Sequence, residues 1–305
     1  MKIPFYPKFS VRILSAGAFQ AFISPQLVPA TDTIRLFLDS KIGGIMAVDS
    51  DLFDLTGQVA LLTGASKGMG YSMAEALAEH GAKVVVSSRK LDQCEAACTQ
   101  INNKCGAGSA IAIACNIGYK DQLQVLVDET HDRLGAIDTL IANAGVNPFY
   151  GPMSEIPDDA YDKIMNSNVR SNHWLCQMVA PDMVEKGSGS MAITASTGAF
   201  SGSLSLGTYA ISKLADIALV RNLALEYGPS GVRVNAICPG LIKTDFAKAL
   251  WDNPEAKKSA ETSTPLRRLG ESDDFKGLAV FLASNASSYM TGQALTVCGG
   301  TNMWR

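Results

Sequence analysis

The sequence has few charged residues, no CxxC cysteine pair and no long hydrophobic run. Charged residues make up 18% of the 305 residues and hydrophobic residues 47%, whereas an average soluble protein has roughly 25% charged residues. This composition excludes a disordered or fibrous chain and predicts a large buried core. The formal net charge of −3 offers no basic surface for nucleic acid. No apolar run reaches the roughly 18 residues that cross a bilayer, so we expect no membrane span.

The seven cysteines show no spacing typical of a metal site, and only three histidines accompany them. Zinc sites and disulfide frameworks are recognised by regular cysteine spacings. We therefore predict neither a metal site nor disulfides. The thiols are interpreted as reduced core residues, which favours a cytoplasmic protein.

Residues 1–48 differ from the rest of the chain. They carry four prolines, have no acidic residue before Asp32, and show no alternation of strand and helix patterns. Basic residues precede the partly apolar stretch Ile13–Ile23, which has some features of a targeting peptide. We interpret the segment as a flexible tail, or as the result of a start codon placed too early, since Met46 directly precedes the globular pattern. We therefore predict an extension, 1–48, and one domain, 49–305.

From Gln58 onward, short apolar runs alternate with segments of helical periodicity. The runs are Val59–Thr63, Val84–Ser87, Ala110–Ala114, Leu140–Ala142, Met191–Thr194, Val232–Ile237 and Ala294–Val297. They are rich in β-branched residues and apolar throughout, as expected for strands buried on both faces. Strands that alternate with helices pair in parallel through right-handed crossovers. We predict a single α/β domain, a doubly wound Rossmann-like fold with a mostly parallel seven-stranded sheet and helices on both faces. Ligands should bind in the loops beyond the carboxyl ends of the strands.

The loop after the first run has three glycines at the spacing GxxxGxG. Glycine permits a sharp turn and a close approach to a diphosphate, and the N-terminus of the following helix offers free N–H groups and partial positive charge. The loop is not a Walker A motif, because Lys67 precedes Gly68 rather than a serine or threonine. We predict that this loop binds a dinucleotide through Gly64, Ser66, Lys67, Gly68, Met69 and Gly70.

The second run ends in Ser87-Ser88-Arg89-Lys90, and no acidic residue follows before Asp92. NAD-preferring sites place an acid about 20 residues after the glycines, where it binds the ribose 2′-hydroxyl. Here Ser88 can donate a hydrogen bond, and Arg89 and Lys67 bring positive charge that would neutralise a 2′-phosphate. We therefore predict NADP(H) in preference to NAD(H). The alternative is that the basic residues are simply solvated.

Tyr209 and Lys213 form the only Tyr-x-x-x-Lys pair of the chain. They open a helical pattern, Tyr209–Tyr227, and their i, i+4 spacing places both side chains on one face. Ser196 lies just after the fifth apolar run. Since a nearby ammonium favours the ionised form of a phenol, Tyr209 can exchange a proton with a carbonyl or an alcohol near neutral pH. Ser196 can hydrogen-bond the same oxygen.

These residues together resemble the short-chain dehydrogenase/reductase family over about residues 52 to 302. The matching motifs are Thr63-Gly64-x-x-x-Gly68-x-Gly70, Asn143-Ala144-Gly145, Asn168, Ser196, Tyr209-x-x-x-Lys213, Pro239-Gly240 with Thr244, Leu269-Gly270-Glu271 and Tyr289-x-Thr291-Gly292. The resemblance implies an oxidoreductase that transfers hydride between a nicotinamide coenzyme and a carbonyl or alcohol. It implies four catalytic residues: Asn168, Ser196, Tyr209 and Lys213.

The resemblance also implies roles for individual residues. Asn168 is expected to hold a water that links Lys213 to solvent, and Lys213 to bind the nicotinamide ribose as well. Tyr209 is also expected to contact the cofactor. The remaining cofactor contacts implied are Asn116, Ile117, Asn143, Ala144, Gly145, Pro239, Gly240, Ile242 and Thr244. The chain departs from the family pattern at Ala142, Asn116 and Cys298, none of which enters the proton chemistry.

Within the family, the chain most resembles the NADPH-dependent carbonyl and retinal reductase branch. The segment Leu241–Pro265 stands where family members carry a loop that covers the substrate, and core packing is the alternative for its apolar residues. The candidates for the substrate pocket are Phe149, Tyr150, Phe246 and Trp251. Their apolar character favours a ketone or aldehyde over a sugar or a carboxylate.

Two other functions stay open. A 3-oxoacyl-carrier-protein reductase shares the catalytic residues, and a docking patch for it could consist of Lys243, Lys248, Lys257 and Lys258. A catalytically silent nucleotide-binding scaffold is the second alternative. The family resemblance further implies a homodimer or homotetramer, built through the helical segments Asp158–Lys186 and Tyr209–Tyr227.

Overall fold

Seven parallel strands form the central sheet of the protein, which the computed structural model describes for residues 50–303. The strands are β1 (Val59–Thr63), β2 (Lys83–Ser88), β3 (Ala110–Ala114), β4 (Thr139–Ala142), β5 (Gly189–Thr194), β6 (Val232–Pro239) and β7 (Ala294–Val297). Their order is β3-β2-β1-β4-β5-β6-β7, so the chain runs outward from β1 to β3 and then returns to pair β4 with β1. The predicted α/β class and the seven-stranded parallel sheet are confirmed.

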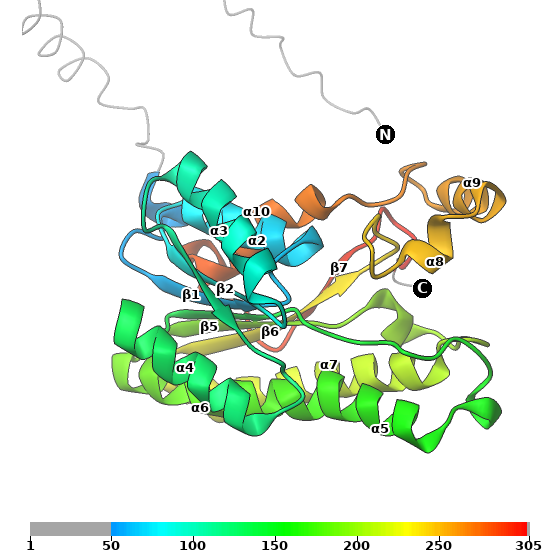
Figure 1. Cartoon of the computed structure of the whole chain (residues 1–305), viewed down its shortest axis with the longest axis horizontal. Coiled ribbons are helices and arrows are strands. Elements are labelled where there is room, and N and C mark those ends of the chain that lie inside the picture. The colour runs from blue at the N-terminus through cyan, green and yellow to red at the C-terminus, as the bar shows by residue number, and fades with distance from the viewer. Residues whose placement is uncertain (1–49, 304–305) are drawn as a thin grey trace, which may run out of the picture. The chain divides into compact units, whose positions relative to one another are not determined.

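Helices cover both faces of this sheet (Figure 1). They are α2 (Gly68–Glu79), α3 (Leu91–Cys105), α4 (Lys120–Leu134), α5 (Asp158–Met165), α6 (Ser171–Lys186), α7 (Gly207–Tyr227), α8 (Lys248–Trp251), α9 (Pro254–Ser263) and α10 (Lys276–Ala283). One face carries α2, α3 and α10, and the opposite face carries α4, α6 and α7. The sheet is therefore the middle of three layers.

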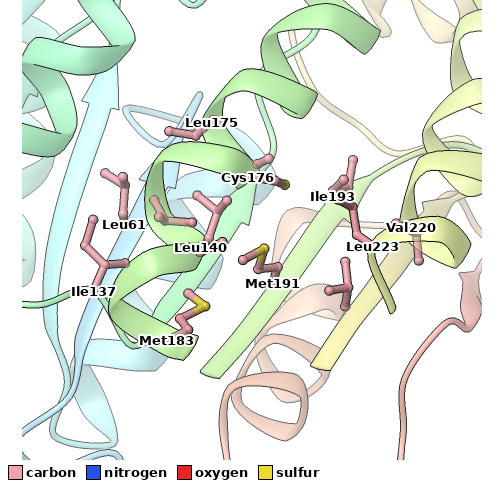
Figure 2. Packing of buried hydrophobic residues seen from close by; sticks show 14 of the residues in the cluster. Leu61, Ile137, Leu140, Leu175, Cys176, Met183, Met191, Ile193, Val220 and Leu223 are labelled. Atoms are coloured by element: carbon pink, nitrogen blue, oxygen red, sulfur yellow. The ribbon is translucent and has the colours of Figure 1, made fainter. Parts of the chain in front are cut away.

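Each face of the sheet packs into its own hydrophobic cluster. On the face of α6 and α7, Leu140 and Met191 of the central strands lie beneath Leu175 and Met183 of α6, as Figure 2 shows. All four side chains are at most 2% exposed. Burying a side chain of this size contributes about 1.5–3 kcal/mol to stability, so the central strands are held firmly where the loops that follow them begin.

The two edge strands differ from the prediction of burial on both faces. Ala114 of β3 and Thr296 of β7 are exposed, and neighbouring residues of both strands are only half-buried. An edge strand has a neighbour on one side only, and the helices do not reach fully over it. An apolar run in the sequence carries no sign of which strand will lie at an edge.

The segment predicted as one helix, Asp158–Lys186, contains a π-helical turn at Asn166–Arg170 between α5 and α6. Such turns insert an extra residue into a helix and are frequent at functional sites. Here the turn buries Ser167 and Asn168 against α7. The interruption thus brings Asn168 into the interior.

The predicted extension, 1–48, lies outside the described residues, and the division of the chain at residue 49 stays a prediction. Within residues 50–303, no helix combines the length and the apolar composition needed to span a membrane.

Candidate active site

A cavity of about 1190 Å³ opens at the carboxyl ends of the strands. The loops after β1, β2, β3, β4, β5 and β6 all contribute to its walls. It includes the switch point between β1 and β4, which is where an open parallel sheet binds its ligand. The cavity therefore lies beyond the carboxyl ends of the strands, where the sequence analysis expects ligands to bind.

The glycine loop forms a tight cradle at one end of the cavity. Gly64 and Gly68 have positive φ angles of 62° and 61°. A Cβ at Gly64 would lie 2.9 Å from the Cα of Ala144, and a Cβ at Gly70 would overlap the carbonyl oxygen of Gly64. Helix α2 begins at Gly68 with no side-chain cap, so its first N–H groups remain available to an anion. This arrangement fits the diphosphate of a dinucleotide.

All but one of the predicted cofactor residues line the cavity. They are Gly64, Ser66, Lys67, Gly68, Met69, Ser88, Arg89, Asn116, Ile117, Asn143, Ala144, Gly145, Tyr209, Lys213, Pro239, Gly240, Ile242 and Thr244. The exception is Gly70, which lies behind the wall and lets α2 approach the loop after β1 closely. Asn143 fixes the loop geometry because its side-chain amide donates to the carbonyl oxygens of Gly64 (3.0 Å) and Thr63 (3.3 Å).

The basic residues predicted to surround a 2′-phosphate differ in their availability. Arg89 is exposed and forms no ion pair within residues 50–303, whereas the ammonium of Lys67 donates to Oδ2 of Asp245 at 2.6 Å. Lys67 is therefore engaged by an acid from the opposite wall, which the sequence spacing could not reveal. The Ser88 hydroxyl oxygen lies 3.2 Å from the Cys94 sulfur, a hydrogen bond in which either atom can be the donor.

Ser196, Tyr209 and Lys213 all line the cavity. Ser196 follows β5, and its hydroxyl oxygen accepts a hydrogen bond from the Gly198 N–H at 3.0 Å, which leaves its own proton free to donate. Tyr209 stands in the first turn of α7, and the ammonium of Lys213, one turn later, lies 5.9 Å from the centre of its ring. The structure thus brings together three of the four predicted catalytic residues.

The Lys213 ammonium is almost completely buried and has two protein partners. It donates to the carbonyl oxygen of Thr194 at 2.7 Å and to Oδ2 of Asp216 at 3.0 Å. Burial lowers the pKa of Lys213, but the Asp216 carboxylate and, after it, Tyr209 raise it, so the pKa lies above its usual value. Burial raises the pKa of Asp216, and the donors Lys213 and Asn172 oppose that rise. With two donors on one carboxylate, the geometry favours the ionised pair.

Asp216 is the residue of this site that the sequence analysis missed. A signal was present, because it is the only acidic residue between Lys213 and Glu226 and stands three residues after Lys213 in an otherwise apolar stretch. That spacing places the two side chains on one face of a helix. The tertiary burial that makes the contact strong cannot be read from the spacing.

Asn168, the fourth predicted catalytic residue, lies behind the cavity wall and is fully buried. Its side chain accepts from the Val146 N–H at 2.8 Å and donates to the Val146 carbonyl and the Ser212 hydroxyl, both at 3.0 Å. The main-chain carbonyl oxygen of Asn168 accepts a hydrogen bond from the side-chain amide of Asn172 at 2.6 Å. Asn168 therefore fixes the loop after β4, and its expected water-holding role stays a prediction.

Two of the four predicted substrate-pocket residues line the cavity. Tyr150 and Phe246 do so, and the Phe246 ring lies 6.1 Å from that of Tyr209. Phe149 and Trp251 are not among the lining residues. The Phe149 ring packs against Gly151, and the Trp251 indole nitrogen is buried. The direction of a loop side chain depends on how the loop packs, so the sequence could not separate Phe149 from Tyr150.

Known proteins share both the sequence and the fold of this chain. Residues 64–302 match the family model described as Enoyl-(Acyl carrier protein) reductase. The chain is 38% identical to human Dehydrogenase/reductase SDR family member 4 over 248 residues, 81% of this chain and 88% of that protein.

Two solved structures are similar as well. A gluconate 5-dehydrogenase from Burkholderia cenocepacia in complex with NADP and tartrate has a TM-score of 0.78 at 29% identity, covering 82% of this chain and 97% of that one. A 7α-hydroxysteroid dehydrogenase complexed with NADH and 7-oxo glycochenodeoxycholic acid has a TM-score of 0.77 at 37% identity, covering 83% and 97%.

The cradle at Gly64 can be tested by Gly64→Ala. The substitution combines an unfavourable positive φ with a clash against Ala144, so we expect NADPH affinity to fall at least about tenfold, equivalent to about 1.4 kcal/mol. Fluorescence titration with NADPH measures the affinity, and urea unfolding measures the free energy of unfolding of the variant.

Gly106→Ala is the matched control, because Gly106 has a φ of 106° and open space where its Cβ would stand. It carries a backbone strain of about 1–3 kcal/mol without the clash, and should leave NADPH affinity unchanged. Equal affinity in the parent chain and Gly64→Ala would contradict the cradle.

Proposed function

The chain belongs to the short-chain dehydrogenase/reductase family, and from this premise we propose that it is an NADP(H)-dependent carbonyl reductase. Its substrates are apolar ketones or aldehydes, and secondary alcohols in the reverse direction. The observation that carries the proposal is one cavity with a glycine cradle at one end and Ser196, Tyr209 and Lys213 together elsewhere in its wall.

The proposed chemistry assigns one task to each side chain. Nicotinamide supplies or accepts the hydride. The Tyr209 hydroxyl donates a proton to the carbonyl oxygen as that oxygen gains negative charge, and takes the proton back in the reverse direction. The Ser196 hydroxyl donates a hydrogen bond to the same oxygen. The Lys213 ammonium stabilises negative charge on the Tyr209 oxygen.

The preference for NADP(H) rests on the residues after β2. The Arg89 guanidinium is exposed at the cavity, and among the described lining residues the only acid is Asp245, which is paired with Lys67. A 2′-phosphate therefore meets positive charge and the Ser88 hydroxyl. The similar solved structures contain NADP in one case and NADH in the other, so this preference is argued from the chain's own residues.

The choice of an apolar substrate rests on the walls near Tyr209. Phe246 lies beside Tyr209, and Leu206, Leu241 and Leu250 are further apolar residues that line the same cavity. The lysines suggested as a docking patch for a carrier protein are partly neutralised, because Lys243 pairs with Glu271 and Lys257 lies 4.0 Å from Glu261. These pairs favour a small apolar carbonyl over a 3-oxoacyl thioester on an acidic carrier. A cytoplasmic location remains a proposal drawn from the cysteines alone.

Helix α7 supports the proposal that copies of the chain associate. Ile211, Leu214, Ala218 and Leu225 are exposed at a spacing of three, four and seven residues, which forms an apolar stripe. Leu223, which the sequence analysis placed on this surface, is 3% exposed and belongs to the core. The helix therefore has one face for its own core and one free for a second copy.

Tyr209→Phe tests the proton transfer. It removes only the hydroxyl, so we expect NADPH oxidation with a panel of ketones, quinones and retinal to fall about 10²–10⁴-fold, while NADPH binding stays within about twofold. Tyr161→Phe, on the exposed surface of α5, is the control. Reduction that persists within about tenfold of the parent rate would exclude Tyr209 as the acid.

Arg89→Asp tests the coenzyme preference. We expect the KM for NADPH to rise at least about tenfold through repulsion of the 2′-phosphate, with little change for NADH, measured as initial rates at varied coenzyme. Lys83→Asp makes the same charge change at the other end of β2 and should affect neither coenzyme. An unchanged KM for NADPH in Arg89→Asp argues against the assignment.

Sedimentation at micromolar concentration tests the association. We expect a dimer or tetramer for the parent chain and a shift to monomer for Leu214→Arg, which puts a charge into the apolar stripe. Val125→Arg, at an equally exposed apolar position on α4, should keep the parent's mass. A monomeric parent chain would disprove the proposal.

A further inference from the structure

A buried polar cluster stands behind Tyr209 where α7, β5 and the start of α6 meet. It consists of Lys213, Asp216 and Asn172, whose exposed fractions are 3%, 0% and 3%. Lys213 donates to Oδ2 of Asp216 at 3.0 Å, and the Asn172 amide donates to Oδ1 at 3.0 Å. Each oxygen of the carboxylate thus has its own donor, and the carboxylate has no freedom to turn.

In the part of the chain that the structure describes, no other charged group faces the cluster. The Thr194 carbonyl of β5 faces the ammonium, together with the Tyr209 phenol of α7 and the Cys238 thiol of β6. The Cys176 thiol of α6 faces the carboxylate. Burial raises the pKa of Cys176 and Cys238 to about 12, so both thiols are neutral at neutral pH. Among residues 50–303, Asp216 is the only carboxylate that faces Lys213.

We propose that Asp216 is a positioning residue of the proposed carbonyl reduction, a fixed counter-ion that keeps Lys213 protonated and aimed at Tyr209. The proposal rests on the proposed function for its kinetic consequence only. The ion pair itself is a property of the fold, and it can be tested without a substrate.

The physical argument starts from the cost of burying an ammonium. A lysine removed from water tends to lose its proton, and fully buried lysines can titrate several pH units below their usual range. The Thr194 carbonyl supplies one hydrogen bond but no charge. A carboxylate in direct contact supplies the charge, and it is itself held by Asn172. With Asp216 in place, Lys213 therefore stays charged beside Tyr209 up to a higher pH than it would without it.

The geometry also fixes direction. Asp216 lies three residues beyond Lys213 on α7, and the Thr194 carbonyl at the end of β5 provides a second acceptor for the same ammonium. With two acceptors fixed, the remaining N–H bond of the ammonium is available on the side of the cavity. Asn172 also donates to the Asn168 carbonyl, so the π-helical turn and α6 hold the carboxylate in place.

The experiment compares Asp216→Asn with the parent chain in two measurements. The first is the pH dependence of kcat/KM for NADPH-coupled ketone reduction. The second is the titration of Lys213 by NMR in protein labelled with ¹³C at lysine Cε, its resonance identified by its loss in Lys213→Met. Asp216→Leu gives a second variant without the carboxylate should Asp216→Asn not fold.

We expect the alkaline limb of the pH profile to move to lower pH by about one unit or more in Asp216→Asn. The Lys213 resonance should keep its ammonium position beyond about pH 10 in the parent chain and titrate below that value in the variant. The shift is to lower pH because Asp216 raises the pKa of Lys213. Without the Asp216 carboxylate, Lys213 loses its proton at a lower pH.

Asp182→Asn is the control. Asp182 is a largely buried carboxylate of α6 that accepts from the Ile137 N–H and from His131, and its loss should alter stability without moving the limb or the Lys213 resonance. A lower rate or lower melting temperature in Asp216→Asn, with the limb and the resonance unchanged, would overturn the proposal. If the parent chain reduced no carbonyl, the proposed function would fail, and the Lys213 resonance alone would decide the role of Asp216.

Discussion

The site depends on a single charge kept out of water. The ammonium of Lys213 lies between the Thr194 carbonyl and the Asp216 carboxylate, and only such partners make a buried positive charge tolerable. Three elements meet to provide them, because Lys213 and Asp216 belong to α7, Thr194 ends β5, and Asn172 begins the regular part of α6. The packing of the sheet and the electrostatics of the cavity are therefore parts of one arrangement.

The fold supplies this arrangement through the central strands. β1, β4 and β5 lie side by side and end at the same edge. The glycine cradle, the Asn143 amide and Ser196 follow these strands in that order. Asn143 also approaches the Thr194 hydroxyl at 3.3 Å and so links the cradle to the strand that holds Lys213. Short loops from these strands hold the Asn143 amide and the Ser196 hydroxyl in place.

Much of this could be predicted from the sequence, because the signals were local. Buried strands such as Val59–Thr63 show as apolar runs, the glycine loop shows as a spacing, and Tyr209 and Lys213 are one helical turn apart. What could not be predicted depends on three-dimensional contact. The pairing of Lys67 with Asp245 joins residues 178 positions apart, and the carboxylate of Asp216 gains its effect from burial. The directions of Phe149 and Trp251 depend on how their loops pack.

The π-helical turn at Asn166–Arg170 also constrains how this region can change over evolutionary time. One residue more or less in a helix rotates everything beyond it by about 100°. The π-helical turn takes up one additional residue locally, so deleting one residue there would close it into a regular α-helical turn and leave Leu175 and Met183 of α6 on the sheet. The same deletion would remove the widening that brings Asn168 into the interior. Loss of a residue from this turn should therefore preserve the packing of the fold and disturb the loop after β4 that Asn168 fixes.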